Sequence, residues 1–290
     1  GGTTIPRLLE ALGCEVVAIN LETDGRFPRA PEPIPENLGD LRRLVRESKA
    51  DIGMAVDPDV DRLALVDETG HPIGEDYTLA FAVRAVLGGR TIGQAHGRTE
   101  RGKSASGPTV RPSAGAPTVV ANLSTSRVVE DAAAAFGARF LRAPVGEANV
   151  ARMIRDEHAV IGGEGNGGVI LPAVHIGRDA PVGVALILEL LRREGRPVSG
   201  IVSEAPQYII VKAKAPRGPD LAPVYDGLRR RFPEAAADTR DGLRLAWADR
   251  WVHARPSGTE PIVRFIAEAP TRADAEALIE ACRGIFQQGN

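Results

Sequence analysis

Short apolar runs alternate with helix-like patterns along the first 200 residues of the chain. The apolar runs predict strands at 15–19, 51–56, 63–67, 118–122, 139–141, 159–162 and 168–171. Apolar positions spaced at the helical repeat predict helices at 6–12, 36–49, 76–87, 126–136, 147–156 and 179–193. Asp179 suits the N-cap of the last of these helices, and Gly195 suits its C-cap. Strands that alternate with helices favour α/β architecture with largely parallel sheets.

The last 85 residues show a different order of elements. Strand patterns lie at 207–214, 242–247, 251–254 and 262–267, and helical patterns lie at 221–232 and 272–286. Consecutive strands without a helix between each pair are typical of an α+β domain. We therefore expect a domain boundary near Ala205 and Pro206, and a chain of 290 residues is long enough for roughly two domains.

Residues 88–117 differ in composition from the rest of the chain. They include seven Gly, three Pro, five Arg or Lys and one acidic residue. Such a segment buries too little apolar surface to offset the entropy of ordering it, so we expect a mobile surface insertion. A basic tether for an anionic partner is the alternative.

The overall composition is that of a soluble globular protein, with 43% hydrophobic and 26% charged residues. The formal net charge of -2 provides no chain-wide attraction for nucleic acid or for an anionic membrane. The aromatic content of 4% also argues against stacking platforms for single-stranded nucleic acid. We expect neither nucleic acid nor a membrane as a partner.

The two cysteines and the chain start bear on location. Cys14 and Cys282 lie near opposite ends, and neither has a second cysteine at the spacing of a zinc or redox pair, so we expect a cytoplasmic protein. No apolar stretch reaches 18 residues, and no signal-peptide pattern occurs at the start. The chain begins at Gly1 without a methionine and runs directly into a helical pattern. We expect it to begin inside a larger protein.

Three carboxylates at alternate positions, Asp57, Asp59 and Asp61, lie between the predicted strands 51–56 and 63–67. Like charges this close raise one another's pKa values unless a cation lies between them, and all-oxygen ligation suits Mg²⁺ or Ca²⁺. The alternatives are an acidic, solvated turn and an EF-hand loop. The EF-hand pattern fails because Arg62 stands at its sixth position, where Gly is needed, and the flanks predict strands.

The sequence Arg-Pro-Ser-Gly-Thr-Glu-Pro at 255–261 can form a compact phosphate receptor. Its members for this purpose are Arg255, Ser257, Gly258, Thr259 and the nearby Arg264. Two hydroxyls, two guanidiniums and a Gly that lets backbone N–H groups converge suit a phosphate dianion. The alternative is a turn in which Ser and Thr only satisfy local backbone groups.

A Gly-rich connection at 162–168 carries Glu164 and Asn166 between two predicted strands. A carboxylate and an amide offer acceptors and donors at the spacing of neighbouring sugar hydroxyls. Gly-rich strand connections are common, however, so this signal is weak by itself. The loop lacks the strand-to-helix context of a dinucleotide-binding fingerprint, which argues against NAD.

The order of the three loops resembles the α-D-phosphohexomutase family, which contains phosphoglucomutases, phosphomannomutases and phosphoglucosamine mutases. The 255–261 sequence matches the family's phosphate-binding loop at every position, and Asp-Pro-Asp-Val-Asp-Arg at 57–62 is a variant of its Asp-Gly-Asp-Gly-Asp-Arg magnesium loop. Connecting sequence such as 31–38 also resembles the family.

The resemblance implies two consecutive mixed-sheet α/β domains followed by a smaller α+β domain. Their bounds would be 1–75 for a metal-binding domain that lacks its first strand, 76–205 for a sugar-binding domain with the insertion at 88–117, and 206–290 for a phosphate-binding domain. The family's first domain, with its Thr-Ala-Ser-His-Asn-Pro loop and phosphoserine, does not occur in these residues. We therefore expect a fragment that is inactive alone.

The resemblance also implies a reaction, the interconversion of hexose 1-phosphates and hexose 6-phosphates through a phosphoserine and a bisphosphate. The roles that it implies are Mg²⁺ ligands at Asp57, Asp59 and Asp61, a supporting catalytic group at Arg62, sugar contacts at Glu164 and Asn166, and phosphate contacts at Arg255, Ser257, Gly258, Thr259 and Arg264. The neutralisation of charge by Mg²⁺ suits the loose transition state of phosphoryl transfer.

One departure concerns the proton carrier. The family's sugar loop usually ends in a His, and Gly168 stands there in this chain. His175 is a candidate replacement, although a lone His after a strand is more often an ordinary surface or core residue. Two hypotheses from other classes stay open: a non-catalytic phosphosugar-binding protein that kept the three loops, and a Ca²⁺-binding structural module, which would require helices around Asp57.

Overall fold

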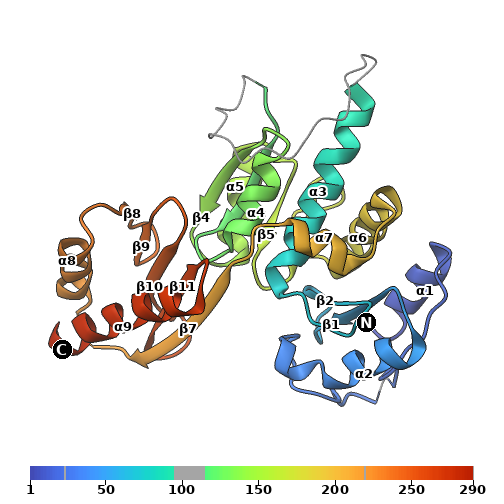
Figure 1. The fold of residues 1–290 in the computed structure, drawn as a ribbon, viewed down its shortest axis with the longest axis horizontal. Coiled ribbons are helices and arrows are strands. Elements are labelled where there is room, and N and C mark those ends of the chain that lie inside the picture. The colour runs from blue at the N-terminus through green and yellow to red at the C-terminus, as the bar shows by residue number, and fades with distance from the viewer. Residues whose placement is uncertain (23, 95–114, 219, 290) are drawn as a thin grey trace. The chain divides into compact units, whose positions relative to one another are not determined.

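A computed structural model describes residues 1–22, 24–94, 115–218 and 220–289, and their contacts form two compact units, Gly1–Pro206 and Gln207–Asn290 (Figure 1). In chain order, the first unit contains α1 (Thr4–Ala11), a 3₁₀ turn (Pro35–Asn37), α2 (Gly39–Ser48), β1 (Ile52–Val56), β2 (Leu63–Asp67), α3 (Glu75–Gln94), β3 (Thr118–Asn122), α4 (Arg127–Ala134), β4 (Arg139–Ala143), α5 (Glu147–Asp156), β5 (Ile161–Glu164), β6 (Gly168–Ile170), α6 (Ala180–Glu194) and α7 (Val198–Glu204). The second unit contains β7 (Ile209–Pro216), α8 (Ala222–Arg231), β8 (Ala236–Asp238), β9 (Leu243–Ala246), β10 (Trp251–Pro256), β11 (Ile262–Ala269) and α9 (Arg272–Gly289).

The strands β1 and β2 form an antiparallel pair that carries the aspartate loop at its turn. The register runs from Ile52 opposite Asp67 to Val56 opposite Leu63, so residues 57–62 connect the two strands. Helix α2 packs on this pair, where Val45 joins a buried cluster with Ala64 and other apolar side chains. The flanks of the aspartate loop are therefore strands, as expected, and this contradicts the EF-hand alternative.

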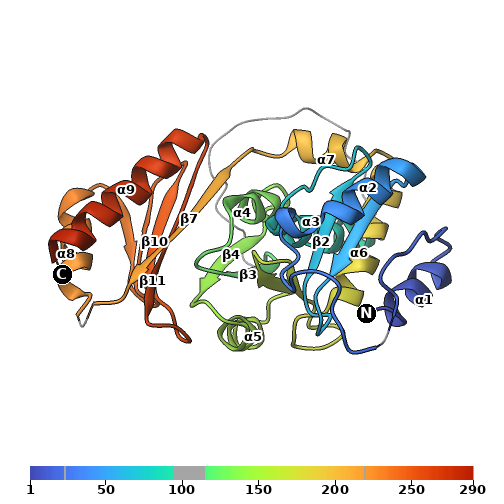
Figure 2. The same ribbon diagram turned by 90° about the horizontal axis from the view of Figure 1, so that it is seen from below.

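A four-stranded sheet of order β4-β3-β5-β6 forms the centre of the first unit. The pairs β3–β4 and β3–β5 are parallel, whereas β5–β6 is antiparallel. Helix α5 covers one face of the sheet and α4 the other (Figure 2). Strand β3 is buried along its whole length, which is why its sequence is a continuous apolar run. The antiparallel turn between β5 and β6 is the Gly-rich connection.

Helix α6 begins and ends at the residues that the sequence predicts. The Asp179 carboxylate accepts a hydrogen bond from the Val182 backbone N–H, and Gly195 closes the helix in the left-handed conformation. Both caps satisfy backbone groups that have no partner inside the helix. Because the N-cap Asp179 directly follows residue 178, it fixes the backbone next to the candidate site.

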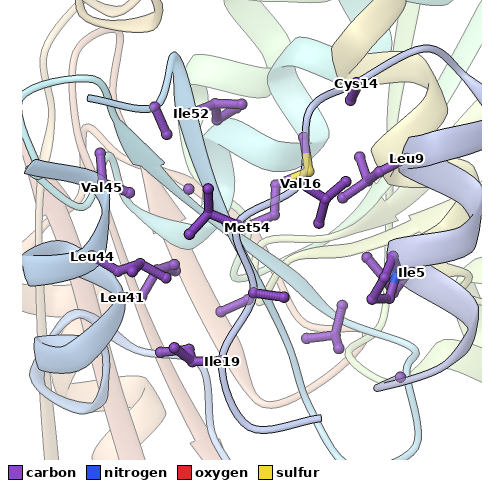
Figure 3. A pocket seen from close by; sticks show the side chains of 18 of the residues that line it. Ile5, Leu9, Cys14, Val16, Ile19, Leu41, Leu44, Val45, Ile52 and Met54 are labelled. Carbon is purple, nitrogen blue, oxygen red and sulfur yellow. The ribbon is translucent and has the colours of Figure 1, made fainter. Parts of the chain in front are cut away.

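The predicted strand 15–19 is wrong, because the structure assigns no strand to these residues. They line a cavity of about 1700 Å³ together with residues of α1, α2 and β1 (Figure 3). Val16 and Ile19 reach this cavity, as do Leu44 and Met54 (Figure 3). The apolar pattern therefore marks side chains that line a cavity, but no strand among the described residues pairs with them.

The second unit is an antiparallel sheet of order β7-β11-β10-β9-β8 with α8 and α9 on one face (Figure 1). Alternate residues of β10 and β11, such as Ala254 and Phe265, face the helices in one buried cluster. The residues between them, such as Arg255 and Arg264, face the opposite side of the sheet. This alternation places the side chains of Arg255 and Arg264 away from the helices.

Other boundaries differ from the sequence predictions. The predicted helix 36–49 is divided by Leu38 into a 3₁₀ turn and α2, and α7 and β8 were not predicted. Helix α3 extends to Gln94, seven residues into the predicted insertion 88–117, while residues 95–114 of that insertion lie outside the described residues. Within the described ranges, no helix is long and apolar enough to span a bilayer.

Candidate functional site

The aspartate loop has a strained backbone at its centre. The Val60 N–H donates to the Asp57 carbonyl over 3.2 Å, which closes a tight turn directly after β1. Val60 adopts a left-handed backbone with φ of 62°, a conformation that costs a β-branched residue roughly 1–3 kcal/mol. Its carbonyl accepts from the Ala180 N–H at the start of α6 over 3.2 Å. The turn is thus held from outside, which is how such strain persists in a folded chain.

Asp57 is the buried anchor of this loop, with 1% of its surface exposed. Its Oδ1 accepts from the backbone N–H groups of Asp61 and Arg62, each over 3.1 Å, and its Oδ2 accepts from the Arg62 guanidinium. Burial by itself raises the pKa of Asp57, but the hydrogen bonds from Arg62 outweigh it and hold that pKa below the ordinary value. Asp57 therefore stays ionised, and Arg62 is positioned by it.

Asp61 is less well satisfied than Asp57. Burial, followed by the nearby Asp57 carboxyl, raises the pKa of the Asp61 carboxyl to about 6, and the charge of Asp59 adds to the rise. Its Oδ2 pairs with Arg178, whereas its Oδ1 is buried and has no hydrogen-bond partner among the described residues. An unsatisfied buried carboxylate oxygen is costly, so this atom is suited to receive a ligand.

The three aspartates fit a hard divalent cation. One carboxylate oxygen from each of Asp57, Asp59 and Asp61 can be chosen so that all three lie within 4.8 Å of one another. The donor set is oxygen only, which Mg²⁺ and Ca²⁺ prefer. A cation placed there would contact the Asp61 Oδ1, which accepts no hydrogen bond within the described chain, and would offset the repulsion among the three carboxylates.

Glu164 lies at the end of β5 and is almost completely buried, with 3% of its surface exposed. Its Oε1 accepts from the Asn122 side-chain amide over 2.8 Å and from the Gly146 N–H over 3.0 Å. Its Oε2 accepts from the Arg178 guanidinium over 2.8 Å. These three donors hold the carboxylate in one orientation. A sugar hydroxyl would have to use the acceptor capacity that they leave.

Gly167 brings the Gly-rich loop against the aspartate loop. The Leu63 N–H donates to the Gly167 carbonyl over 3.0 Å, and Gly167 has a φ of 92°. A Cβ atom at this residue would lie 2.5 Å from the Leu63 carbonyl oxygen, so only Gly fits. The neighbouring Asn166 turns its Oδ1 inward to accept from the Gly168 N–H over 3.2 Å. Two loops that are far apart in the chain therefore meet at their backbones.

Arg178 connects these two loops through its side chain, and the sequence analysis assigned it no role. Its guanidinium pairs with Asp61 of the aspartate loop and with Glu164 of the Gly-rich loop. Its backbone N–H donates to the Glu147 carboxylate over 2.8 Å. The only sequence signal is a basic residue directly before a predicted N-cap, and neither spacing nor periodicity indicates which acidic residues it contacts.

His175 contacts Asp179 rather than the residues of this arrangement. The imidazole is about half exposed, and its Nε2 contacts the Asp179 carboxylate at 2.8 Å. No hydrogen bond or ion pair in the described chain joins it to Glu164 or to the three aspartates. Its role as a proton carrier stays a prediction.

The 255–261 motif lies in the second unit, at the turn between β10 and β11. Arg255 donates through Nε to the Asp241 carboxylate over 2.9 Å, and only 17% of its side chain is exposed. Asp241 precedes Gly242, where a Cβ atom would lie 2.4 Å from the Ala254 carbonyl oxygen. This close approach places Asp241 beside Arg255. The contact with Asp241 uses only Nε, and a guanidinium has further N–H groups that suit a bidentate anion contact.

A row of three basic residues crosses the sheet on this side. Arg255 lies opposite Arg264, and Arg264 lies opposite Lys214 of β7, a residue that the sequence analysis did not identify. Directly opposed like charges destabilise a sheet unless an anion or a counter-charge lies near. Arg264 has one counter-charge in Glu260, at 2.8 Å. Arg255 has its own counter-charge in Asp241, so two of the three positive charges in the row have a paired carboxylate.

The remaining motif residues form the turn itself. The Ser257 Oγ accepts from the backbone N–H groups of Thr259 and Glu260 over 3.4 and 3.3 Å. Ser257 is buried, whereas Gly258 and Thr259 are exposed. The alternative interpretation, a turn whose hydroxyls satisfy local backbone groups, therefore applies to Ser257. The exposed Gly258 and Thr259 remain accessible to an anion.

Comparisons with known proteins agree across most of the chain. Three models of the phosphoglucomutase/phosphomannomutase family match: alpha/beta/alpha domain II at residues 1–70, alpha/beta/alpha domain III at 105–208 and the C-terminal domain at 212–285. The probable phosphoglucosamine mutase of Methanopyrus kandleri is 37% identical over 279 residues, which cover 94% of this chain and 56% of the relative. The phosphoglucomutase/phosphomannomutase of Thermococcus kodakarensis is 35% identical over 285 residues, which cover 97% and 57%.

The solved structures give the same result. A phosphoglucomutase/phosphomannomutase family protein from Burkholderia thailandensis superimposes with a TM-score of 0.80 at 27% identity. The match covers 99% of this chain and 58% of that protein. The chain thus spans a little over half the length of the curated and solved relatives that it matches.

Proposed function

Because the chain belongs to the phosphoglucomutase/phosphomannomutase family, with its domains II, III and IV, we propose that it carries the metal-binding, sugar-binding and phosphate-binding parts of a phosphohexomutase. The reaction would interconvert hexose 1-phosphates and hexose 6-phosphates of glucose, mannose or glucosamine. Relatives named phosphoglucosamine mutase and phosphoglucomutase/phosphomannomutase support this range of substrates.

We propose the following division of roles. Asp57, Asp59 and Asp61 would hold Mg²⁺, and that ion would supply positive charge to a transferring phosphoryl group. Arg62, which Asp57 positions, would support the same group. Glu164 and Asn166 would contact sugar hydroxyls. In the second unit, Arg255, Ser257, Gly258, Thr259 and Arg264 would bind the phosphate that does not react.

The aspartate cluster is the observation that carries the proposal. Three carboxylates within 4.8 Å, one of them with a buried oxygen that accepts no hydrogen bond within the described chain, are difficult to explain as a solvated acidic turn. An acidic turn would point its charges into water, whereas Asp57 has 1% of its surface exposed. The cost of burying these charges is understandable if a cation compensates for it.

The domain division proposed for this chain follows the family. The boundary near residue 206 coincides with the division into two compact units, and residues 1–75 and 76–205 are proposed as two domains within the first unit. The 290 residues contain no Thr-Ala-Ser-His-Asn-Pro sequence. We therefore propose that these residues alone bind ligands without turnover, because phosphoryl transfer through a phosphoenzyme needs a positioned side chain that carries the phosphoryl group. A cytoplasmic location also remains a proposal.

Calorimetry on the 290-residue chain tests the binding roles. Mg²⁺ should bind the wild-type chain, and Asp59→Asn should abolish the heat of binding, because the variant removes one of the three carboxylates. Asp59 is the exposed member of the cluster, so its replacement disturbs no buried contact. Glucose 6-phosphate and mannose 6-phosphate should bind weakly, and Arg255→Ala should remove about 1.5–3 kcal/mol, the scale of a charge-assisted hydrogen bond. Identical titrations for variant and wild type would contradict the assigned role.

A coupled assay of glucose 1-phosphate conversion, with bisphosphate activator present, tests the reaction. The chain should turn over only when a domain with a phosphorylatable serine is supplied with it. If hexose phosphates bind but no such supplied domain restores turnover, the alternative of a non-catalytic phosphosugar-binding protein would explain the result.

A further inference from the structure

We propose that Arg178 is a positioning residue that occupies the place of a cation at Asp61, and that a divalent cation displaces it toward Glu147 and Glu164. Metal binding at the aspartate loop would then change the contacts of Arg178, the side chain that also pairs with Glu164 of the Gly-rich loop. This inference rests on the proposed function, because it assumes that the aspartate cluster binds a divalent cation.

The first argument is the charge balance around the side chain. Arg178 lies against three carboxylates from three separate segments: Asp61, Glu164 and Glu147. Only 18% of its side chain is exposed, so its attraction to these groups is weakly screened. Asp61 contacts two guanidiniums: its Oδ2 pairs with Arg178, and its Oδ1 lies 3.7 Å from the Arg62 Nε. A cation and the Arg178 guanidinium would compete for the same carboxylate.

The second argument is that both partners of the Asp61–Arg178 pair have unsatisfied atoms. The Asp61 Oδ1 and the Arg178 Nε are buried and have no hydrogen-bond partner within the described chain. The Arg178 Nε lies 3.7 Å from the Glu147 carboxylate, just beyond hydrogen-bond distance. A small shift of the guanidinium away from Asp61 would let Nε donate to Glu147, and a cation would then satisfy Asp61.

The third argument is that the backbone of residue 178 is fixed while its side chain has a choice of partners. The Arg178 N–H donates to Glu147, and the adjacent Asp179 caps α6 through Val182. The hydrogen bond from Arg178 to Glu164 can persist whether Arg178 also pairs with Asp61 or with Glu147. It uses a different guanidinium nitrogen from the contact with Asp61. The exchange therefore needs only side-chain rotation.

A consequence follows for the two loops. Arg178 holds Asp61 and Glu164 together without metal, and it is attached to Glu164 and Glu147 when metal is bound. Because coupling between two sites is reciprocal, a ligand that draws Arg178 to the Gly-rich loop should tighten metal binding by the same factor that metal tightens that ligand.

Mg²⁺ titration of four chains tests the exchange: the wild type, Arg178→Met, Glu147→Gln, and the double variant. Arg178→Met should bind Mg²⁺ at least about fivefold more tightly, because the competing guanidinium is gone. Glu147→Gln should bind about threefold more weakly, because the displaced guanidinium loses a charged acceptor. In the double variant the effect of Glu147→Gln should disappear.

Glu157→Gln is the matched control for the loss of one negative charge. Glu157 directly follows the other end of α5 and pairs with Arg139, so its replacement should leave Mg²⁺ affinity unchanged. A purely structural ion pair at Arg178 predicts the opposite sign for Arg178→Met, namely weaker Mg²⁺ binding in a less stable chain. The Glu147→Gln comparison does not depend on whether Arg178→Met folds.

The outcomes separate the two proposals. If Asp59→Asn abolishes Mg²⁺ binding but Arg178→Met leaves it equal or weaker, or if Glu147→Gln matches Glu157→Gln, the exchange is overturned and the metal site stands. If Asp59→Asn and the wild type bind Mg²⁺ alike, the metal site itself is wrong, and both proposals fail.

Discussion

The buried imidazole of His253 should make the stability of the C-terminal unit depend on pH. His253 lies on β10 with none of its surface exposed. Its Nε2–H donates to the Asp241 carbonyl over 2.6 Å, since a carbonyl can only accept. Burial lowers the pKa of His253 to about 4, although the contact with Asp241 opposes the change. The folded unit therefore contains a neutral imidazole at pH values where an exposed histidine would be charged.

The sign and the size of the effect follow from linkage. In the unfolded chain the imidazole has a pKa near 6.5, so below this pH the unfolded state takes up a proton that the folded state does not. Stability is complete above pH 6.5, falls as the pH decreases, and stops falling near pH 4. The whole difference corresponds to about 3 kcal/mol, of which about 2 kcal/mol is lost between pH 7.5 and pH 5.

Urea unfolding followed by tryptophan fluorescence measures this contribution directly. The sequence has two tryptophans, Trp247 and Trp251, and both lie in the C-terminal unit, so the signal reports on that unit. His253→Gln keeps a side-chain N–H for Asp241 but does not titrate. The loss in the free energy of unfolding between pH 7.5 and pH 5 should be about 2 kcal/mol smaller in this variant than in the wild type. An equal loss in both chains would refute the reasoning.

Three further perturbations test the backbone and charge arguments. Gly167→Ala should lower the free energy of unfolding by about 2 kcal/mol or more, because a Cβ would approach the Leu63 carbonyl oxygen to 2.5 Å in a left-handed conformation; a denaturant midpoint within error of the wild type would exclude this steric argument. Val60→Gly should be about 1 kcal/mol more stable than Val60→Ala, since only Gly adopts this backbone without strain. Thermal unfolding would show the reverse order if the turn were relaxed. Lys214→Ala should weaken binding of glucose 6-phosphate a few-fold at low salt and much less at high salt, because this exposed lysine extends the positive row beside Arg264. Salt-independent titrations would exclude that role.

Local features of the chain could be predicted from sequence because they depend on residues only a few positions apart. The caps of α6 are an example, since Asp179 and Gly195 act on backbone groups within one turn. The aspartate loop is another, because β1 and β2 pair directly on either side of it and bring three alternate carboxylates together. The two strands that frame the 255–261 turn, β10 and β11, were predicted for the same reason.

The failed and incomplete predictions concern partners that lie far away in the chain. Residues 15–19 have the apolar character of a strand, but a strand also needs a neighbour with which to exchange backbone hydrogen bonds, and none is assigned there among the described residues. Helix α3 continues past Leu87 through Gly88 and Gly89, where local propensity alone predicted its end. Tertiary contacts outweighed the cost of these glycines, since Arg193 of α6 donates to carbonyls of α3.

The sequence by itself determined which residue types meet within each loop: carboxylates at 57–61, a carboxylate and an amide at 164–166, and hydroxyls with guanidiniums at 255–264. Only the tertiary structure decided how the first two loops are joined. Arg178 reaches Asp61 and Glu164 because α6 starts beside both loops, and Gly167 lets their backbones touch. Periodicity and spacing describe neighbours along the chain, whereas an ion pair between distant segments depends on how sheets and helices pack, and no local pattern records that.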